Sequence, residues 1–119
     1  MTIREKAAIV GVGATPYYRR GESYPQTELE LAGKAILSAL DDAGLAVSDL
    51  DGFAIYSSSC DPAEVASVLG VPEVRFAAGL TSGGGGCAGA LGLAAAAIEA
   101  GMASCVVTLM RSLLCSLTS

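Results

Sequence analysis

Short apolar runs alternate with longer amphipathic segments along this chain. The first run, Ala7–Gly13, is apolar throughout and ends in glycine, a pattern typical of a strand buried on both faces. Three more apolar runs predict strands over residues 52–57, 74–80 and 104–110. Helical segments separate these runs, so the order β-α-β-α-β-α-β predicts an α/β fold with a mostly parallel sheet.

Start and stop signals bound the helical segments. Thr27 and Glu30 have the spacing of a capping box, and Gly44 supplies a stop. Asp61 as a cap and Pro62 at the first helical position start a second, shorter helix. Within the first helix, apolar residues recur on one face at Leu29, Ala32, Ile36, Leu40 and Ala43.

The last residues, 111–119, fit neither pattern, because they have weak periodicity, no cap and no stop signal. Hydrophobic residues make up 52% of the chain and charged residues 16%, which is apolar for an independent domain of this size. We therefore expect residues 1–119 to be one incomplete domain, truncated where a longer one continues. A membrane span is not expected, since the long uncharged stretch is largely glycine and alanine.

Charge and residue types narrow the possible chemistry. The net charge is −5 and the longest basic run is Arg19-Arg20, which argues against binding to nucleic acid. The four cysteines are widely spaced, as expected for free thiols in a cytoplasmic protein. The chain has no histidine, so neither a zinc site nor Ser–His or Cys–His catalysis is expected within it.

The most distinctive segment is the glycine run at residues 82–89, which leads into a long apolar helix predicted over residues 90–100. A glycine loop that enters a helix presents backbone N–H groups, with the positive end of the helix dipole behind them. Such a loop suits a carbonyl oxygen, a carboxylate or a reactive thiol. The candidate binding residues are therefore Gly83, Gly84, Gly85 and Gly86.

The same run contains the spacing G-x-G-x-x-G, which dinucleotide-binding loops share. That interpretation needs an acidic residue about 20 residues further on. No aspartate or glutamate follows Glu99, so a dinucleotide is not expected. No metal or other cofactor is expected either.

Cys87 lies in this run and has two interpretations. A thiol near a helix N-terminus has a lowered pKa and can act as a nucleophile, whereas a free cysteine is more commonly a small buried apolar residue. Because the chain offers no histidine as a base, the second interpretation is favoured, and we expect Cys87 to face packed backbone. Asp49 and Asp51 are expected to serve a turn and not general acid–base chemistry.

Several segments taken together resemble the N-terminal half of thiolases: AIVGVGATPY at residues 8–17, LA at 31–32, ALDDAGL at 39–45 and SDLDG at 48–52. The match is best to the sterol-carrier type, which includes acetyl-CoA acetyltransferases and lipid-transfer proteins, and it extends from about residue 7 to residue 109. The resemblance implies the N-terminal β-α-β-α-β-α-β half of a thiolase fold with a buried central helix. It also implies a homodimer that takes an acyl-CoA or sterol-CoA as substrate.

In thiolases the acyl-accepting cysteine stands at the start of the central helix, at a constant interval from the glycine that ends it. Residues 94–101 resemble the end of that helix, and counting back from Gly101 puts the nucleophile position on Gly84. Cys87 lies three residues further on, about 4.5 Å along the helix axis and most of a turn round. The resemblance therefore implies that Gly84, which offers only its backbone amide, replaces the nucleophile.

This glycine replacement is a feature of non-thiolytic, lipid-transfer-type members of the superfamily. Some of them resemble retro-aldolases that cleave the side chains of sterol-CoA thioesters with a small OB-fold partner, and their catalytic groups lie in the C-terminal half. The leading hypothesis is therefore an acyl-CoA-handling protein of the lipid-transfer/aldolase type that is catalytically incomplete in this chain. An acyltransferase fragment with Cys87 as nucleophile and a non-catalytic lipid-binding or interaction module are the alternatives.

Overall fold

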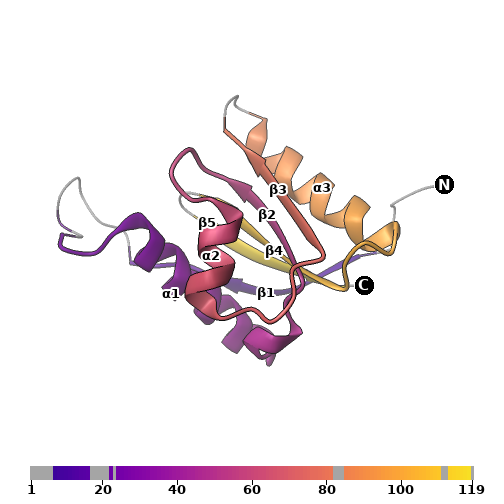
Figure 1. Ribbon diagram of the computed structural model, residues 1–119, viewed down its shortest axis with the longest axis horizontal. Coiled ribbons are helices and arrows are strands. Elements are labelled where there is room, and N and C mark those ends of the chain that lie inside the picture. The colour runs from indigo at the N-terminus through magenta and orange to yellow at the C-terminus, as the bar shows by residue number, and fades with distance from the viewer. Residues whose placement is uncertain (1–6, 17–21, 23, 82–84, 111–112, 119) are drawn as a thin grey trace.

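The computed structural model describes residues 7–16, 22, 24–81, 85–110 and 113–118. Over these residues, three helices and a short 3-10 turn alternate with strands along the chain (Figure 1). The order is β1 (Ala8–Gly13), α1 (Glu28–Ala43), the 3-10 turn (Val47–Asp49), β2 (Gly52–Tyr56), α2 (Pro62–Leu69), β3 (Phe76–Leu80), α3 (Gly86–Glu99), β4 (Cys105–Met110) and β5 (Leu113–Thr118).

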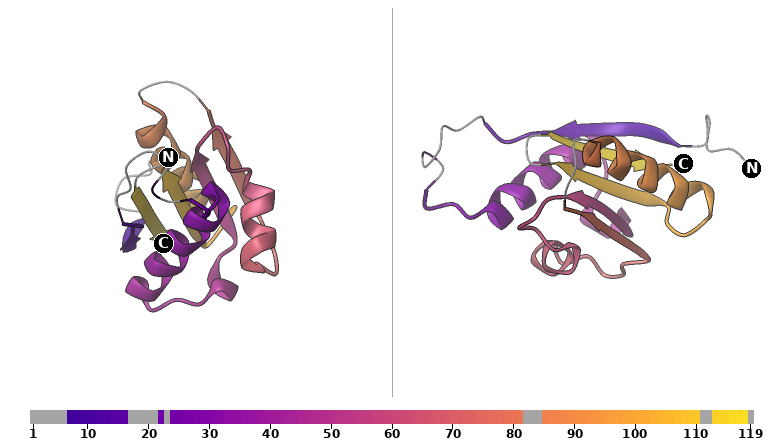
Figure 2. Two further views of the ribbon diagram at one scale, coloured as in Figure 1. Left: turned by 90° about the vertical axis from the view of Figure 1, so that its left-hand side faces the viewer. Right: turned by 90° about the horizontal axis from the view of Figure 1, so that it is seen from above.

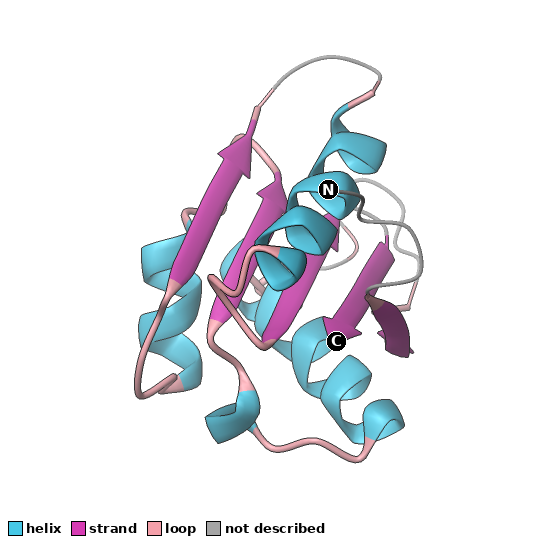
Figure 3. Ribbon diagram, turned by 90° about the vertical axis from the view of Figure 1, so that its right-hand side faces the viewer, coloured by secondary structure: helices cyan, strands magenta, loops and turns pink. Residues whose placement is uncertain are grey.

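The described strands form one five-stranded sheet in the order β1-β5-β4-β2-β3. β2 runs parallel to both of its neighbours, β3 and β4, whereas β5 runs antiparallel to β1 and β4. The helices α1 and α2 cover one face of the sheet and α3 covers the other, which the views in Figures 2 and 3 show. The α/β fold with a parallel sheet that the sequence predicted is confirmed.

The segment after β4 is the main difference from the sequence prediction. Residues 113–118, for which no element was expected, form β5 and lie between β1 and β4. β5 follows β4 after two residues, a connection that can reach an antiparallel neighbour but is far too short for a parallel one. Its sequence LLCSLT lacks the regular alternation of a half-buried strand, so pairing on both sides is what makes it one.

β1 lies at one edge of the sheet, and the prediction that it is buried on both faces was wrong. Its Ile9 and Val12 side chains are 54% and 46% exposed. Gly11 and Gly13 lie so close to α1 that a Cβ added at either would collide with backbone atoms of that helix. β1 is therefore paired with β5 along one side and packed against α1, while Ile9, Val10 and Val12 stay largely exposed.

The caps of α1 and α2 follow the sequence prediction in part, since only the Thr27 half of the predicted capping box is present among the described contacts. The Thr27 hydroxyl accepts a hydrogen bond from the Glu30 N–H at 3.1 Å, and Gly44 ends α1 with φ of 70°. Pro62 occupies the start of α2 as expected, but the Asp61 side chain makes no capping hydrogen bond. A proline at this position has no N–H to satisfy, which lowers the need for a capping acceptor.

α3 begins at Gly86, four residues before the predicted start at residue 90. One side of it is buried against the sheet through Ala90 and Ala94, while Leu93 on the other side is 40% exposed. The expected burial at the centre of the fold is therefore present on one side of this helix only. Among the described helices, none has the length and apolar character needed to cross a membrane.

Candidate functional site

The carboxyl ends of β2 and β3 and the first turn of α3 meet at one edge of the sheet (Figure 3). Ligands of open α/β sheets bind at this kind of edge, because the loops that leave parallel strands converge there. Of the predicted binding residues, Gly83 and Gly84 lie outside the described residues. Gly85 and Gly86 are described, and both stand at the start of α3.

The start of α3 has no side-chain cap. Gly85 is the N-cap residue, and its carbonyl accepts the first helical hydrogen bond from the Gly89 N–H at 2.8 Å. The N–H groups of the first turn have no partner within the helix, and glycine offers no side chain that could take their place. This part of the predicted site therefore has the geometry of a backbone donor for an oxygen atom.

Tyr56 is a site residue that sequence reasoning missed. It is the last residue of β2, and its ring lies against the backbone of Gly86, leaving no room for a side chain there. One signal was available in the sequence, because Tyr56 lies near the end of a predicted strand at the same edge as the glycine run. The contact itself joins residues 30 positions apart and has no local signature.

Cys87 is half-buried, which differs from the expectation that it would face packed backbone. The buried line of α3 runs through Gly86, Ala90 and Ala94. Cys87 is turned about 100° away from this line, because each residue of an α-helix advances by that angle. The thiol is therefore in reach of small reagents but has no histidine in the chain to act as its base.

A hollow of about 380 Å³ lies beside this edge, between the loop after β2 and the end of β3. Within it the hydroxyl oxygens of Ser57 and Ser59 lie 3.3 Å apart, and the Ser59 N–H donates to the Ser57 oxygen at 3.2 Å. None of the residues around this hollow was predicted as a site residue from the sequence. Its lining residues are Ser57, Ser58, Ser59, Cys60, Asp61, Pro62, Glu64, Gly79 and Thr81.

Cys60 is the buried thiol of this hollow and is 8% exposed. Burial raises its pKa above the ordinary value, because a thiolate loses its hydration there. A hydrogen bond with Ser57 acts in the opposite direction, while the carboxylates of Glu28 and Glu64 raise the pKa further. Cys60 is therefore a protonated, weakly reactive thiol at neutral pH.

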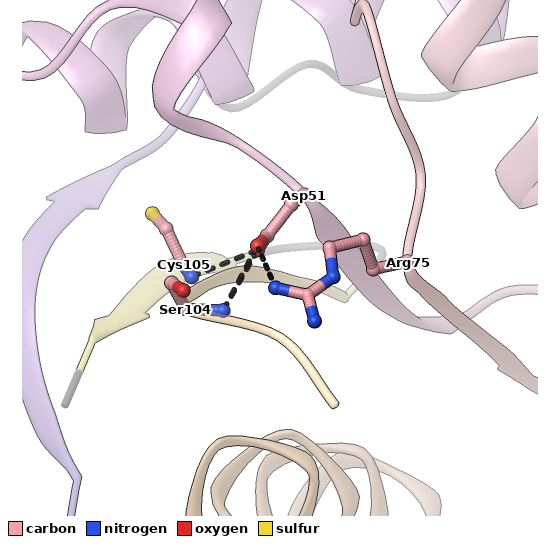
Figure 4. Close-up of polar contacts among 4 residues, drawn as sticks. All are labelled: Asp51, Arg75, Ser104 and Cys105. Carbon is pink, nitrogen blue, oxygen red and sulfur yellow. Dashed lines mark hydrogen bonds and ion pairs between the residues drawn. The ribbon is translucent and has the colours of Figure 1, made fainter. Parts of the chain in front are cut away.

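Asp51 lies at the opposite, amino-terminal edge of the sheet, as Figure 4 shows in close-up. Its carboxylate accepts hydrogen bonds from the Ser104 N–H at 3.0 Å and the Cys105 N–H at 2.9 Å. It also lies 3.9 Å from the Arg75 guanidinium. Asp51 thus joins the starts of β2, β3 and β4, and it has no part in the candidate site.

Asp49 has the turn role that the sequence predicted. Its carboxylate accepts a hydrogen bond from the Ala46 N–H at 2.8 Å, three residues back. Among the described residues, no group of three or more acidic, cysteine or histidine side chains is arranged to hold a metal ion.

No protein-family model matches the chain. Two curated proteins are each 37% identical to it. One is a steroid side-chain-cleaving aldolase from Thermomonospora curvata, aligned over 85% of this chain and 25% of that protein. The other is a 17-hydroxy-3-oxo-4-pregnene-20-carboxyl-CoA lyase from Mycobacterium tuberculosis, aligned over 86% of this chain and 26% of that protein. The chain spans about a quarter of the length of these relatives.

Solved structures agree with these sequence matches. The Ltp2–ChsH2(DUF35) aldolase superposes with a TM-score of 0.77 and 36% identity over 87% of this chain and 26% of that chain. A monomeric SCP2-thiolase-like protein from Mycobacterium smegmatis has a TM-score of 0.69 and 27% identity over 87% of this chain and 22% of that chain.

A priming β-ketosynthase, at 17% identity, has a TM-score of 0.76 over 94% of this chain and 49% of that chain, a likeness of fold alone. The structural neighbours are thiolase-fold proteins, and the chain has the α/β fold of a part of such proteins.

Proposed function

We propose that this chain forms the thiolase-like N-terminal part of a lyase that cleaves the side chain of a CoA-linked steroid by a retro-aldol reaction. The observation that carries the proposal is the agreement of two relatives. Both are 37% identical over most of the chain, and both are named for cleaving steroid side chains or CoA-linked steroids. The superposition on an aldolase at 36% identity supports the same choice.

The proposed substrate class is a 3-hydroxyacyl-CoA whose hydroxyl stands on a steroid ring carbon. In the retro-aldol step a base removes the hydroxyl proton and the C–O bond becomes a ketone. The adjoining carbon–carbon bond breaks, and its electron pair moves into the thioester as an enolate, which is then protonated. The products are a ketosteroid and a shorter acyl-CoA.

The start of α3 suits the thioester end of this reaction. Backbone N–H groups at a helix N-terminus stabilise negative charge that develops on a carbonyl oxygen. We propose that the amides of the glycine run, with Gly84 first and Gly85 and Gly86 beside it, bind the thioester oxygen. The chain contains no histidine, so we propose that it is catalytically incomplete alone and that the base lies outside it.

The open edge of β3 supports a homodimer as the proposed assembly. Within the described sheet β3 pairs only with β2, and its FAAGL sequence has no charge or proline that would keep another strand away. A small OB-fold protein is a second proposed partner, and the matched two-component aldolase supports such an arrangement. The free thiols Cys60 and Cys87 suit a reducing, cytoplasmic location.

A chimaeric aldolase tests the proposed function. The segment of the Thermomonospora curvata aldolase that aligns with this chain is replaced by the corresponding 102 residues of this chain. The ketosteroid and the shorter acyl-CoA are then quantified after incubation with the 17-hydroxy steroid thioester. We expect activity within about ten-fold of the parent, because a related segment with the same fold should keep the geometry of the site. A segment that displaced the site by about 1 Å would lower activity by about 100-fold.

The control chimaera carries the same segment from the priming β-ketosynthase, which shares the fold but only 17% identity. A cooperatively melting chimaera with this chain that is no more active than the control would contradict the proposal.

Acyl transfer through Cys87 is the second candidate, favoured by the position of this half-buried thiol as the second residue of α3. Mass spectrometry of the chain after incubation with acetyl-CoA and acetoacetyl-CoA separates the two candidates. We expect no acyl adduct on Cys87. An adduct that survives gel filtration and is released by free CoA would favour the acyltransferase.

A further inference from the structure

We propose that Tyr56 is a positioning residue that sets the first turn of α3 at the candidate site, and that Gly86 is glycine because of it. The pair would determine where the first N–H groups of α3 point. The contact between Tyr56 and Gly86 is seen in the structure. The further claim that this contact orients N–H groups toward a thioester oxygen rests on the proposed function.

The place of Tyr56 in the sheet brings its ring to α3. β2 is flanked by β3 and β4, and Tyr56 at its end is paired with Leu80 and Met110. Side chains alternate between the faces of a strand, so Tyr56 lies on the same face as Ala54. Both belong to the apolar cluster that packs under α3, whereas Phe53 and Ile55 belong to the cluster under α1.

The contact with Gly86 is so close that a side chain there would force the Tyr56 ring or the first turn of α3 to move. A Cβ added at Gly86 would overlap with three ring carbons of Tyr56, Cδ2, Cε2 and Cζ. The other described glycines at this helix are different. A Cβ at Gly89 would make an ordinary contact of 3.6 Å with a Leu80 methyl group, and those at Gly85 and Gly92 would meet nothing within 4 Å.

Among the described residues, the start of α3 has no side-chain cap that could hold its first turn in place. The N-cap residue Gly85 makes no side-chain hydrogen bond, and the first turn contains no acidic residue. A tyrosine ring has few rotamers and is flat and rigid, so it defines one depth at which the helix backbone can pack. The ring of Tyr56 therefore fixes the position of the first turn.

Substitutions at Tyr56 and Gly86, made singly and together, test the pair in the full chain without any substrate. The readout is the alkylation rate of Cys87, the next residue after Gly86, resolved by peptide mapping and expressed relative to the buried Cys60 of the same molecule. Gly86→Ala should raise this ratio by about five-fold or more, because overpacking favours local opening of the turn. Gly89→Ala is the matched control and should leave the ratio unchanged.

Two further variants distinguish positioning from a general loss of stability. Tyr56→Phe keeps the ring and should lie closer to the wild type than Tyr56→Ala does, because the proposed role belongs to the ring. Tyr56→Ala combined with Gly86→Ala should bring the ratio back toward that of Tyr56→Ala alone, since the added methyl then has room. If Gly86→Ala does not fold, recovery of a cooperative melt in the double variant supports the pair.

The proposal is overturned if Gly86→Ala behaves like Gly89→Ala. It is also overturned if the double variant is as disturbed as Gly86→Ala, or more so, while Tyr56→Ala alone folds. These outcomes do not depend on turnover, so they are separate from a failure of the proposed function. In an active chimaera, Gly86→Ala should lower kcat by about ten-fold or more with little change in KM, and Tyr56→Phe, which keeps the ring, should lower kcat less than Gly86→Ala does.

Discussion

The two faces of the sheet are built from different residues and hold their helices in different ways. Under α1 and α2 the strands present large side chains, among them Phe53, Ile55 and Val107. Under α3 the cluster consists largely of alanines, with Ala54 from the sheet and Ala90 from the helix. α1 therefore sets small residues such as Ala35 and Ala39 beside Ile36 and Leu40 against its face of the sheet, whereas under α3 helix and strand both contribute mainly alanine.

The glycines whose side-chain position is blocked by a neighbour do not gather on the face with the small residues. The glycine-rich start of α3 contains one described glycine, Gly86, that its surroundings demand, while Gly92 faces open space. β1 has only Gly11 and Gly13, and both are required, because the backbone of α1 occupies the place of a side chain. The difference teaches that the number of glycines in a segment does not locate the tightest packing. A glycine is required where the backbone of another element occupies the place of its side chain, as at Gly11 and Gly13.

Gly13→Ala should destabilise the chain more than any change on the α3 face. The added methyl would collide with the Ala39 N and Ala35 O atoms, and helix backbone cannot move aside as the end of a side chain can. We expect a loss of about 3 kcal/mol or more in the free energy of unfolding, or failure to fold. Urea denaturation followed by circular dichroism measures it.

Gly33→Ala in α1 is the matched control, since a Cβ there meets nothing within 4 Å. It should leave stability unchanged or raise it by up to about 1 kcal/mol. Equal stability of both variants would show that α1 does not press on β1 in solution.

The thiols on the two faces should differ in reactivity. Cys60 is buried and Cys87 is half-buried, so Cys87 should react with iodoacetamide at pH 7.5 about ten-fold faster or more, because local opening limits a buried group. Alkylation of each residue is followed by peptide mass spectrometry. Equal rates would indicate that the face containing Cys60 opens as readily as the start of α3.

The pH dependence of stability should reflect Cys60. Burial raises its pKa in the folded chain above the ordinary value of 9.0. Below this value both folded and unfolded chains keep the proton and the thiol contributes no pH dependence. Above it the unfolded chain loses the proton first, so the free energy of unfolding should fall as the pH rises through 9. Cys60→Ser should flatten this slope, and an unchanged slope would assign it to other groups.

Thr108→Val tests how a buried hydroxyl group on the α3 face affects the free energy of unfolding. Thr108 is fully buried and shares a strand face with Val106, and its hydroxyl has no hydrogen-bond partner among the described residues. Replacing an unpartnered buried hydroxyl by a methyl of the same shape should raise the free energy of unfolding by about 1 kcal/mol. Val106→Thr on the same face is the control and should lower it. A clear loss of stability in Thr108→Val would reveal a partner for the hydroxyl.

Gly92→Ala should have the smallest effect and the opposite sign to Gly13→Ala. Its Cβ would point into open space on the outer side of α3. Alanine has the higher helix propensity, so we expect a gain of about 0.5–1 kcal/mol in thermal or urea unfolding. Destabilisation instead would show that something packs against the outer side of α3, such as a second copy of the chain.

Elements whose signals are local could be predicted closely from the sequence. The start and end of α1 depend on Thr27 and Gly44, which act on backbone groups within a few residues. The same is true of Pro62 at the start of α2. The position of the glycine run between a strand and a helix was also predictable, and Gly85 and Gly86 lie between β3 and α3, because a loop that leaves a strand lies where the strand ends.

Long-range contacts decided the rest. β5 became a strand because β1 and β4 offer it partners on both sides, and β1 became an edge because β5 lies between it and β4. The packing of Gly86 against the Tyr56 ring joins residues 30 positions apart, and neither periodicity nor capping signals predict it. The sequence by itself determined the order of the elements from β1 to β4 and most of their bounds, since those follow from local propensity. Tertiary structure decided their neighbours, their burial and the exact setting of the candidate site, because these depend on which backbones approach one another.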